Sequence, residues 1–501
     1  MQTGIDLVQM QLQIEEFIKA SQRPVVLEPG EEPLHLLGDN FALNPRASAL
    51  TFECWTDTRN LVRRIRRILA QRRGRLELEA ERFGGRTGPL LLLDLAQPSS
   101  ESATRQGIRL EFRERFRRSL HRQFADWKLM ELSTDPDLHH SLSPSFARAF
   151  LKRGNLGLAA IGASENCLDP DGALSFGLIW LDHLRRRERR VAVEGLALFL
   201  PSGAEAATCH RLRYLDPKAA RYAIFVHTPG AYEVPVDPRD YTNLATRLEP
   251  FREPLAGCSA EVRAWVARLT QEEAVEPRPR PDGSVSLAVR GIEFARTSGD
   301  ALLFGLDHPH AAGLHAAGGE WHVREAEQIA QGIARFRRDG EDRRHPLFAA
   351  HPEAWLEAQV RQSIEALDAT LLPERLYSQA PHMAGGDRGI VDLLAVDRHG
   401  RLAVLEIKAS QDIHLPLQAL DYWMRVKWHL DRGEFTAQGY FPGIALSSEP
   451  PRLLMVAPAL DFHPTNEALL RFFSREVRAE RLGVGIEWRR ELRVMFRAGS
   501  D

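Results

Sequence analysis

The stretch Gly389-Ile-Val-Asp392-Leu-Leu-Ala-Val-Asp-Arg-His-Gly400-Arg-Leu-Ala-Val-Leu-Glu406-Ile-Lys408 decides how the C-terminal third of this 501-residue chain is predicted to fold. Its two apolar runs, at 390–396 and 402–409, are typical of buried β-strands, and the polar turn between them suits a hairpin connection. A hairpin lays the two strands side by side. We therefore expect Asp392 in the first strand to lie close to Glu406 in the second.

The residue types in this hairpin predict hydrolysis of phosphodiester bonds. An acidic side chain inside an apolar strand is costly to bury without a partner, and Glu406 and Lys408, two residues apart, project from the same face of their strand. Converging carboxylates suit Mg²⁺, which takes one or two of them and keeps other positions for water and phosphate. A neighbouring ammonium group can hold the attacking water and offset negative charge on the phosphate.

Outward from the hairpin, the pattern predicts an α/β domain, a mixed sheet flanked by helices. Helices are expected at 352–367, 416–430 and 466–473, and strands at 376–379 and 453–458, with a final hairpin within 485–497. Gln418 and Tyr422 are four residues apart and share one face of the second helix. Their polar groups are candidates for holding a nucleic-acid backbone beside the metal.

These motifs resemble the RecB-like branch of the PD-(D/E)xK nuclease superfamily and are similar to the C-terminal domain of NucS-type endonucleases. The shared features are the interval of 14 residues between Asp392 and Glu406 (406 − 392), the ExK spacing and the QxxxY helix. The resemblance covers about 75 residues, from Glu353 to Val426, and implies a restriction-endonuclease-like α/β nuclease core. It does not extend to the larger mixed α/β N-terminal region, so no substrate preference follows from it.

The resemblance also implies roles for individual residues. Asp392, Glu406 and the backbone carbonyl of Ile407 would hold Mg²⁺, for which Mn²⁺ can substitute, and Lys408 would be the catalytic lysine. Gln418 and Tyr422 would support the site. A further acid would come from the preceding helix, where Glu357 is the better match to the family and Glu353 is the alternative.

Four regions are predicted: 1–275, a mixed α/β region of unknown function that could hold two subdomains; 276–284, a proline-rich linker; 285–344, a small bridging segment of β-strands and a helix; and 345–501, the nuclease domain. Within the first region, arginine-rich helices are expected at 57–71 and 110–132, as DNA-binding elements or as solvated, salt-bridged faces. A faint second copy of the nuclease pattern is a further hypothesis, on Asp182, Glu194 and Leu196.

Composition excludes several other classes of protein. The net charge is −2, with 44% hydrophobic and 27% charged residues, which is typical of a soluble globular protein rather than a broadly basic one. The four cysteines include no CxxC pair, so neither a zinc site nor a disulfide framework is predicted. A polar N-terminus and the absence of long apolar runs predict a cytoplasmic protein without a membrane segment.

The leading hypothesis is therefore a cytoplasmic, Mg²⁺-dependent endonuclease that hydrolyses DNA in repair, recombination or defence. Whether the DNA is single-stranded, branched or duplex stays open. The alternative is a catalytically silent nucleic-acid-binding or protein-interaction scaffold on the same fold, with residues 1–275 as the region for a protein partner. A homodimer is a further expectation, because a double-strand cut needs two active sites.

Overall fold

The computed structural model describes residues 2–499 except 29–33, 37–39, 47–48, 56–59, 73, 82–86, 95–99, 138–139, 166, 168, 229–230, 240–246, 306–314, 317–319, 339–344 and 379–391. In these ranges the chain forms twelve helices and four β-sheets, so the predicted α/β class is confirmed. The first part of the predicted strand at 390–396, Ile390 and Val391, lies outside the described residues.

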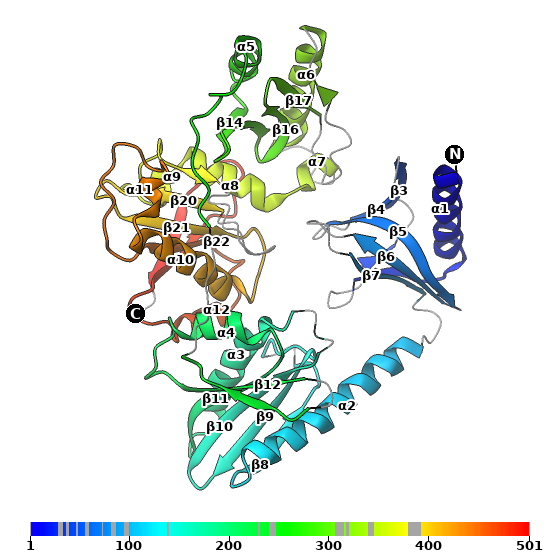
Figure 1. Ribbon diagram of the computed structural model, residues 1–501, viewed down its shortest axis with the longest axis vertical. Helices are drawn as coiled ribbons and strands as arrows, with labels where there is room; N and C mark the ends of the chain where they lie inside the picture. The colour runs from blue at the N-terminus through cyan, green and yellow to red at the C-terminus, as the bar shows by residue number, and fades with distance from the viewer. Residues whose placement is uncertain are drawn as a thin grey trace.

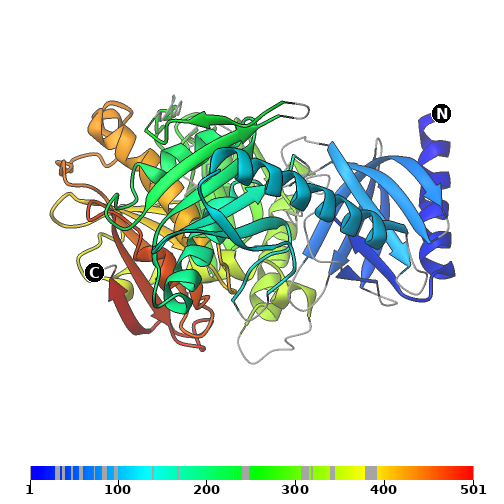
Figure 2. The same cartoon turned by 90° about the horizontal axis from the view of Figure 1, so that it is seen from below.

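The N-terminal unit is an antiparallel sheet covered by one helix, and it lies at one end of the molecule (Figure 2). Its elements are α1 (Gln2–Ala20), β1 (Pro24–Leu27), β2 (Leu34–His35), β3 (Phe41–Arg46), β4 (Ala49–Trp55), β5 (Asn60–Arg72), β6 (Arg75–Glu81) and β7 (Thr87–Asp94). The strand order is β2-β1-β7-β6-β5-β4-β3. Met10, Ile14 and Phe17 of α1 pack with Phe52, Ile65 and Leu78 of the sheet into one core.

The predicted helix at 57–71 is wrong, because this segment is strand β5. Its pairing with β6 shifts register at two β-bulges, between Ile65 and Arg67 and between Ile68 and Ala70. Each bulge adds one residue to the strand. The apolar positions Leu61, Ile65 and Ile68 therefore fall three or four apart, which is the spacing of a helix face.

The arginines of β5 are largely paired with glutamates. Arg63 Nη2 lies 2.6 Å from Oε2 of the buried Glu28, Arg67 Nε lies 2.9 Å from Glu79 Oε2, and Arg66 pairs with Glu81. These ion pairs favour the salt-bridged alternative over a bare cationic face for DNA.

The middle unit is a six-stranded sheet with helices on both faces (Figure 1). Its elements are α2 (Ser100–Gln123), β8 (Lys128–Ser133), β9 (Phe146–Arg153), β10 (Leu156–Ala163), α3 (Gly172–Arg187), β11 (Ala192–Pro201), α4 (Glu205–Leu212), β12 (Arg221–His227) and β13 (Val234–Val236). The predicted helix at 110–132 ends nine residues early, because Phe124 to Trp127 form a turn into edge strand β8.

The third unit corrects the predicted linker. It comprises α5 (Ala260–Leu269), β14 (Val275–Pro279), β15 (Val285–Val289), β16 (Ile292–Ser298), β17 (Ala301–Phe304), β18 (His315–Ala316) and α6 (Glu320–Phe336). The proline-rich segment is edge strand β14, paired antiparallel with β15. Proline is tolerated at an edge because its missing N–H need not face a neighbouring strand. Helix α5 shares its core with β15–β17 and α6, so the unit begins before residue 276.

The C-terminal unit follows the predicted order closely. It contains α7 (Pro346–Ala349), α8 (Pro352–Gln362), α9 (Ile364–Leu367), β19 (Tyr377–Ser378), β20 (Leu393–Val396), β21 (Leu402–Ile407), α10 (Leu415–Asp431), α11 (Glu434–Ala437), β22 (Arg452–Pro458), α12 (Thr465–Leu470), β23 (Arg478–Val484) and β24 (Val494–Gly499). The predicted hairpin at 485–497 is misplaced, because its first strand, β23, ends at Val484 and residues 485–493 form the connection to β24.

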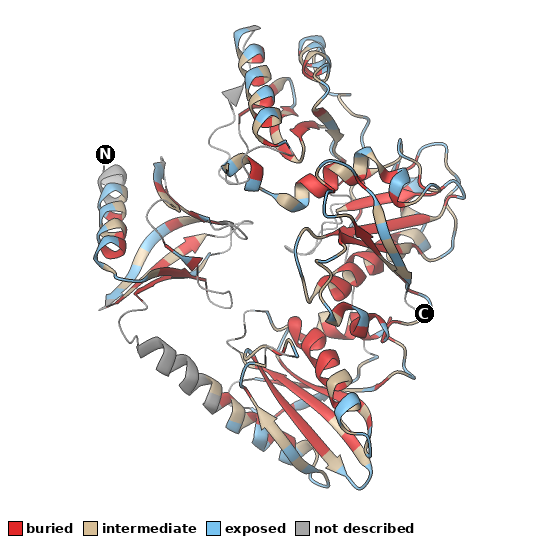
Figure 3. Ribbon diagram, turned by 180° about the vertical axis from the view of Figure 1, so that it is seen from behind, coloured by how far each residue is buried: buried red, intermediate tan, exposed pale blue. Residues whose placement is uncertain are grey.

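The middle and C-terminal units share one hydrophobic core, which includes Trp180 of α3 and Trp423 of α10. Helices α3, α4, α10 and α12 lie between the two sheets (Figure 1), and the central strands of both sheets are buried (Figure 3). Within the described ranges, none of the helices has the length and apolar composition needed to cross a lipid bilayer.

Candidate active site

The two predicted acids meet at the start of β20 and the end of β21. The pairing Leu393↔Leu405 continues so that Asp392 lies opposite Glu406. The Asp392 carboxylate accepts a hydrogen bond from the backbone N–H of Ile407 at 2.7 Å. Glu406 is almost fully buried, with 1% of the residue exposed. The hairpin therefore brings the two carboxylates together as the sequence predicts.

Lys408 completes this cluster from the residue just after β21. Its Nζ lies 3.3 Å from Glu406 Oε1 and 3.9 Å from Glu353 Oε2. The backbone N–H of Lys408 is held by the carbonyl of Val456 in β22 at 2.9 Å, which fixes the chain where the lysine leaves the sheet. The ammonium group is thus placed between two acids from different elements.

Burial and like charge make the two carboxylates hard to ionise without a cation. Burial raises the pKa of Asp392 to about 7; the hydrogen bond from Ile407 and the charge of Lys408 lower it only in part, and the charges of Glu357 and Glu353 raise it. Burial, followed by the charge of Asp392, raises the pKa of Glu406 well above its usual range. Although burial alone would lower it, the facing carboxylates raise the pKa of Lys408 above its ordinary value. The lysine is therefore a fixed positive charge and no base at neutral pH.

The site fits a divalent cation with oxygen ligands. Oε2 of Glu406 is buried and has no hydrogen-bond partner among the residues that the structure describes, which is unusual for a carboxylate oxygen and is relieved by a cation. The N–H and C=O of a strand residue point to the same side, so the Ile407 carbonyl is directed toward the Asp392 side. Among the described side chains, no group of three or more His, Cys, Asp or Glu forms a ready metal cage. Mg²⁺ does not require one, since it keeps several waters.

Both candidate acids on α8 face the cluster. Glu353 is half exposed and pairs with Lys408, and burial raises its pKa. Glu357 is buried and accepts a hydrogen bond from Ser378 Oγ at 2.8 Å. Both acids act on the charge of Asp392, and Glu353 also acts on Glu406, so both stay candidates for the helix-borne acid.

Gln418 and Tyr422 lie together on α10, as their spacing predicts. Gln418 Nε2 donates to the Tyr422 hydroxyl at 3.3 Å. Burial and then the charge of Glu406 raise the pKa of Tyr422 to about 12, so the phenol stays protonated beside the acids. It is available as a hydrogen-bond donor on the α10 side of the site.

A set of charged residues behind Glu357 was not predicted from the sequence. Arg278 of β14 lies 3.8 Å from Glu357 Oε1 and 3.1 Å from Glu276 Oε2. Arg361 of α8 lies 2.6 Å from Glu276 Oε1 and donates to Ser378 Oγ. The third unit thus reaches the candidate site through β14. The alternation of Glu276 and Arg278 within the proline-rich segment is the signal that could have suggested a strand.

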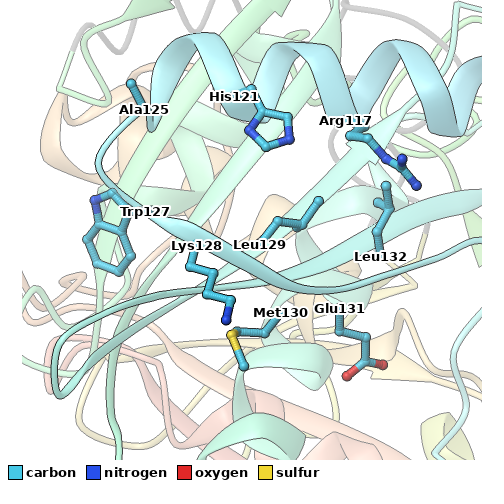
Figure 4. Close-up of a pocket in the computed structure, with 9 residues that line it drawn as sticks. All are labelled: Arg117, His121, Ala125, Trp127, Lys128, Leu129, Met130, Glu131 and Leu132. Carbon is cyan, nitrogen blue, oxygen red and sulfur yellow. The ribbon is translucent and has the colours of Figure 1, made fainter.

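One pocket lies away from these residues. It measures about 570 Å³ and lies between the end of α2 and strand β8, lined by Arg117, His121, Lys128 and Glu131 among others (Figure 4). Among its described lining residues Glu131 is the only acid, and this residue pairs with Arg187 at 2.8 Å. Such a lining lacks the paired carboxylates of a Mg²⁺ site.

Comparison of the chain with family models, curated proteins and solved structures found no match. The resemblance to the nuclease superfamily therefore rests on the motif residues themselves and on their arrangement around β20, β21 and α10.

Proposed function

We propose that the C-terminal unit is a Mg²⁺-dependent endonuclease that hydrolyses DNA phosphodiester bonds. The observation that carries the proposal is the convergence of Asp392, Glu406 and Lys408, with one buried Glu406 oxygen that no described residue hydrogen-bonds. A purely structural ion pair would gain stability from satisfying that oxygen. An active site gains from leaving it for a cation.

The charge and position of each residue in the site indicate its role in this reaction. Asp392, Glu406 and the Ile407 carbonyl would hold the cation, and Glu357 would complete the acid set. A bound Mg²⁺ would supply a more acidic water and stabilise charge on the scissile phosphate. Lys408, held protonated by its acidic neighbours, orients the attacking water and offsets charge that develops on the phosphate.

Substrate positioning falls to the α10 face. The Tyr422 hydroxyl, kept protonated, and the Gln418 amide are donors next to the acids. Donors of this kind contact phosphate and sugar groups and carry no base information by themselves. In the cell we propose DNA repair, recombination or defence in the cytoplasm, on the strength of the motif resemblance.

Cleavage assays test the proposal directly. Labelled single-stranded, duplex, flapped, mismatched and circular DNAs are incubated with Mg²⁺, Mn²⁺ or EDTA, and wild type is compared with Glu406→Gln. Glu449→Gln is the matched control, since this residue lies in the same unit, is 62% exposed and pairs only at the surface with Arg401. We expect metal-dependent cutting by wild type and the control and none by Glu406→Gln.

The same assay separates the silent scaffold. If no DNA is cut with any metal, while DNA binding is equal in wild type and Glu406→Gln, the non-catalytic nucleic-acid-binding protein becomes the better description. An RNA panel run in parallel tests the assignment to DNA.

A further inference from the structure

The middle and C-terminal sheets have the same topology. In chain order, the pairings of β8–β13 are antiparallel, antiparallel, parallel, parallel and antiparallel. The pairings of β19–β24 repeat this series. Helices α3 and α10 each follow the third strand, α4 and α12 each follow the fourth, and α2 and α8 each precede the first. We call these two units the middle core and the C-terminal core.

The two cores meet through equivalent residues. Leu215, three residues after α4, forms an antiparallel bridge with Phe473, three residues after α12. The N–H of Asp216 donates to the carbonyl of Phe472 at 2.7 Å, and the N–H of Ser474 donates to the carbonyl of Tyr214 at 2.8 Å. Each partner gives and receives the same bond, which is the mark of an isologous, two-fold contact.

The strand registers show which residues occupy the same positions. Strand β11 ends at Pro201 and β22 ends at Pro458. Gly162 pairs with the residue two positions before Pro201, and Ile407 pairs with the residue two positions before Pro458, so Gly162 and Ile407 are equivalent. Ile161 then stands where Glu406 stands, and Ala163 where Lys408 stands. Across the hairpin, Ile161 pairs with Arg148, which takes the position of Asp392.

The faint second pattern predicted in the sequence was therefore placed on the wrong residues. Asp182 lies in α3 and Glu194 in β11, and neither lies in the hairpin that corresponds to β20 and β21. The middle core is equivalent to the C-terminal core in strand order and strand direction, and it lacks the sequence motif of Asp392, Glu406 and Lys408.

At the position equivalent to the candidate site, the described residues of the middle core offer no ligand pair for a cation. Arg148 is buried, with 6% exposed, so a guanidinium already stands where a metal ligand would be. Asp137, Glu131 and Asp135 are the acids that act on this positive charge. Gly177 of α3 lies against Ile161, and a Cβ there would be only 3.1 Å from an Ile161 methyl group. In the middle core, helix α3 is thus in direct contact with strand β10. At the corresponding place in the C-terminal core, Tyr422 of α10 faces Glu406 of β21.

We infer that the chain is a fused, asymmetric pair of nuclease-type cores in which only the C-terminal core cleaves, so that one monomer cuts one strand of a duplex. The inference rests on the proposed function for its cleavage step. Cutting both strands at one site needs two active sites of opposite orientation. Here the isologous surface that would recruit a second active core is already covered by the middle core.

Three measurements on the full chain test this inference. Light scattering should give the mass of one chain. A Mn²⁺ titration should find one site, which is lost in Glu406→Gln. Supercoiled plasmid should be converted to nicked circles at a rate proportional to protein concentration, with linear DNA appearing only after nicked circles. Ile161→Val is the control in the middle core and should leave all three results unchanged.

The results separate this inference from the proposed function. A dimer that produces linear plasmid directly, or a second Mn²⁺ site retained in Glu406→Gln, would overturn the asymmetric pair while the nuclease stands. If no DNA is cut, the cleavage step fails together with the proposed function. A monomer with a single Glu406-dependent Mn²⁺ site would in that case still support the pairing of one metal-binding core with one that binds none.

Discussion

Replacing Glu406 by Gln should make the metal-free protein more stable, although it destroys the candidate site. Glu406 is 1% exposed, and its Oε2 has no hydrogen-bond partner among the described residues. Lys408 at 3.3 Å is its close counter-charge in the described part of the chain, and the pKa of Glu406 stays raised in spite of it. A neutral amide of nearly the same shape removes the unfavourable charge from this environment.

The expected gain follows from the cost of an unsatisfied buried group. Such a group costs about 1–3 kcal/mol, and more when it is charged. The loss of the ion pair with Lys408 offsets part of this gain. The offset is only partial because Lys408 keeps Glu353 as a partner at 3.9 Å. We expect a net stabilisation of about 1–3 kcal/mol, or roughly 1–3 °C in apparent Tm for a protein of this size.

Thermal unfolding in EDTA and in Mn²⁺ measures the effect. In EDTA, Glu406→Gln should melt above wild type, and Glu449→Gln should stay within about 0.5 kcal/mol of it. Mn²⁺ at a hundred times its Kd should stabilise wild type by about 2.7 kcal/mol and leave Glu406→Gln unchanged. A variant that melts below wild type in EDTA, or that responds to Mn²⁺ as wild type does, would refute the reasoning.

Three further predictions concern the same unit. Lys408→Ala should slow cleavage about 10²–10³-fold, because a fixed charge at the phosphate is lost. DNA affinity, measured by fluorescence anisotropy, should be nearly unchanged. A large loss of affinity would instead make Lys408 a binding residue. In calorimetric titrations, Glu357→Gln should weaken Mn²⁺ binding about 10-fold or more. Glu353→Gln should weaken it less than about threefold, because Glu353 is half exposed whereas Glu357 is buried. The reverse order would identify Glu353 as the helix-borne acid. Asp368→Asn should cost about 2 kcal/mol at pH 7: burial alone would raise the pKa of Asp368, but its hydrogen bonds and the Arg452 guanidinium at 2.6 Å hold it well below the usual range. Because a lowered acid pKa stabilises the fold above about pH 4 and the benefit declines below it, the difference from wild type in urea unfolding should shrink between pH 5 and pH 3. A constant difference would contradict that account.

The part of the site that could be predicted from the sequence is the part built from neighbouring segments. Asp392, Glu406 and Lys408 lie on one hairpin, and Gln418 and Tyr422 lie on one helix face, so spacing alone relates them. The contact between Glu357 of α8 and Arg278 of β14 joins segments about 80 residues apart through tertiary packing, which no local pattern encodes. The same limit hid the equivalence of the two cores.

The errors in the fold predicted from the sequence had local physical causes. In β5, two bulges gave a strand the apolar spacing of a helix. In β14, alternating prolines were interpreted as a linker, although proline also suits the outer edge of a sheet. In both segments the backbone is extended and paired, and tertiary contacts outweigh local propensity.

The single hydrophobic core shared by α3 and α10 has a consequence for anyone who wishes to dissect this protein. Removal of residues 1–250 would strip the partner surface from Trp423 and leave a large apolar face in water, which favours aggregation. Asp421, which pairs with Arg211 across the same junction at 2.7 Å, would lose that counter-charge. The C-terminal unit therefore cannot be separated from the middle unit. The two should melt in one cooperative transition, and a shortened chain that keeps the C-terminal unit folded should begin no later than residue 100.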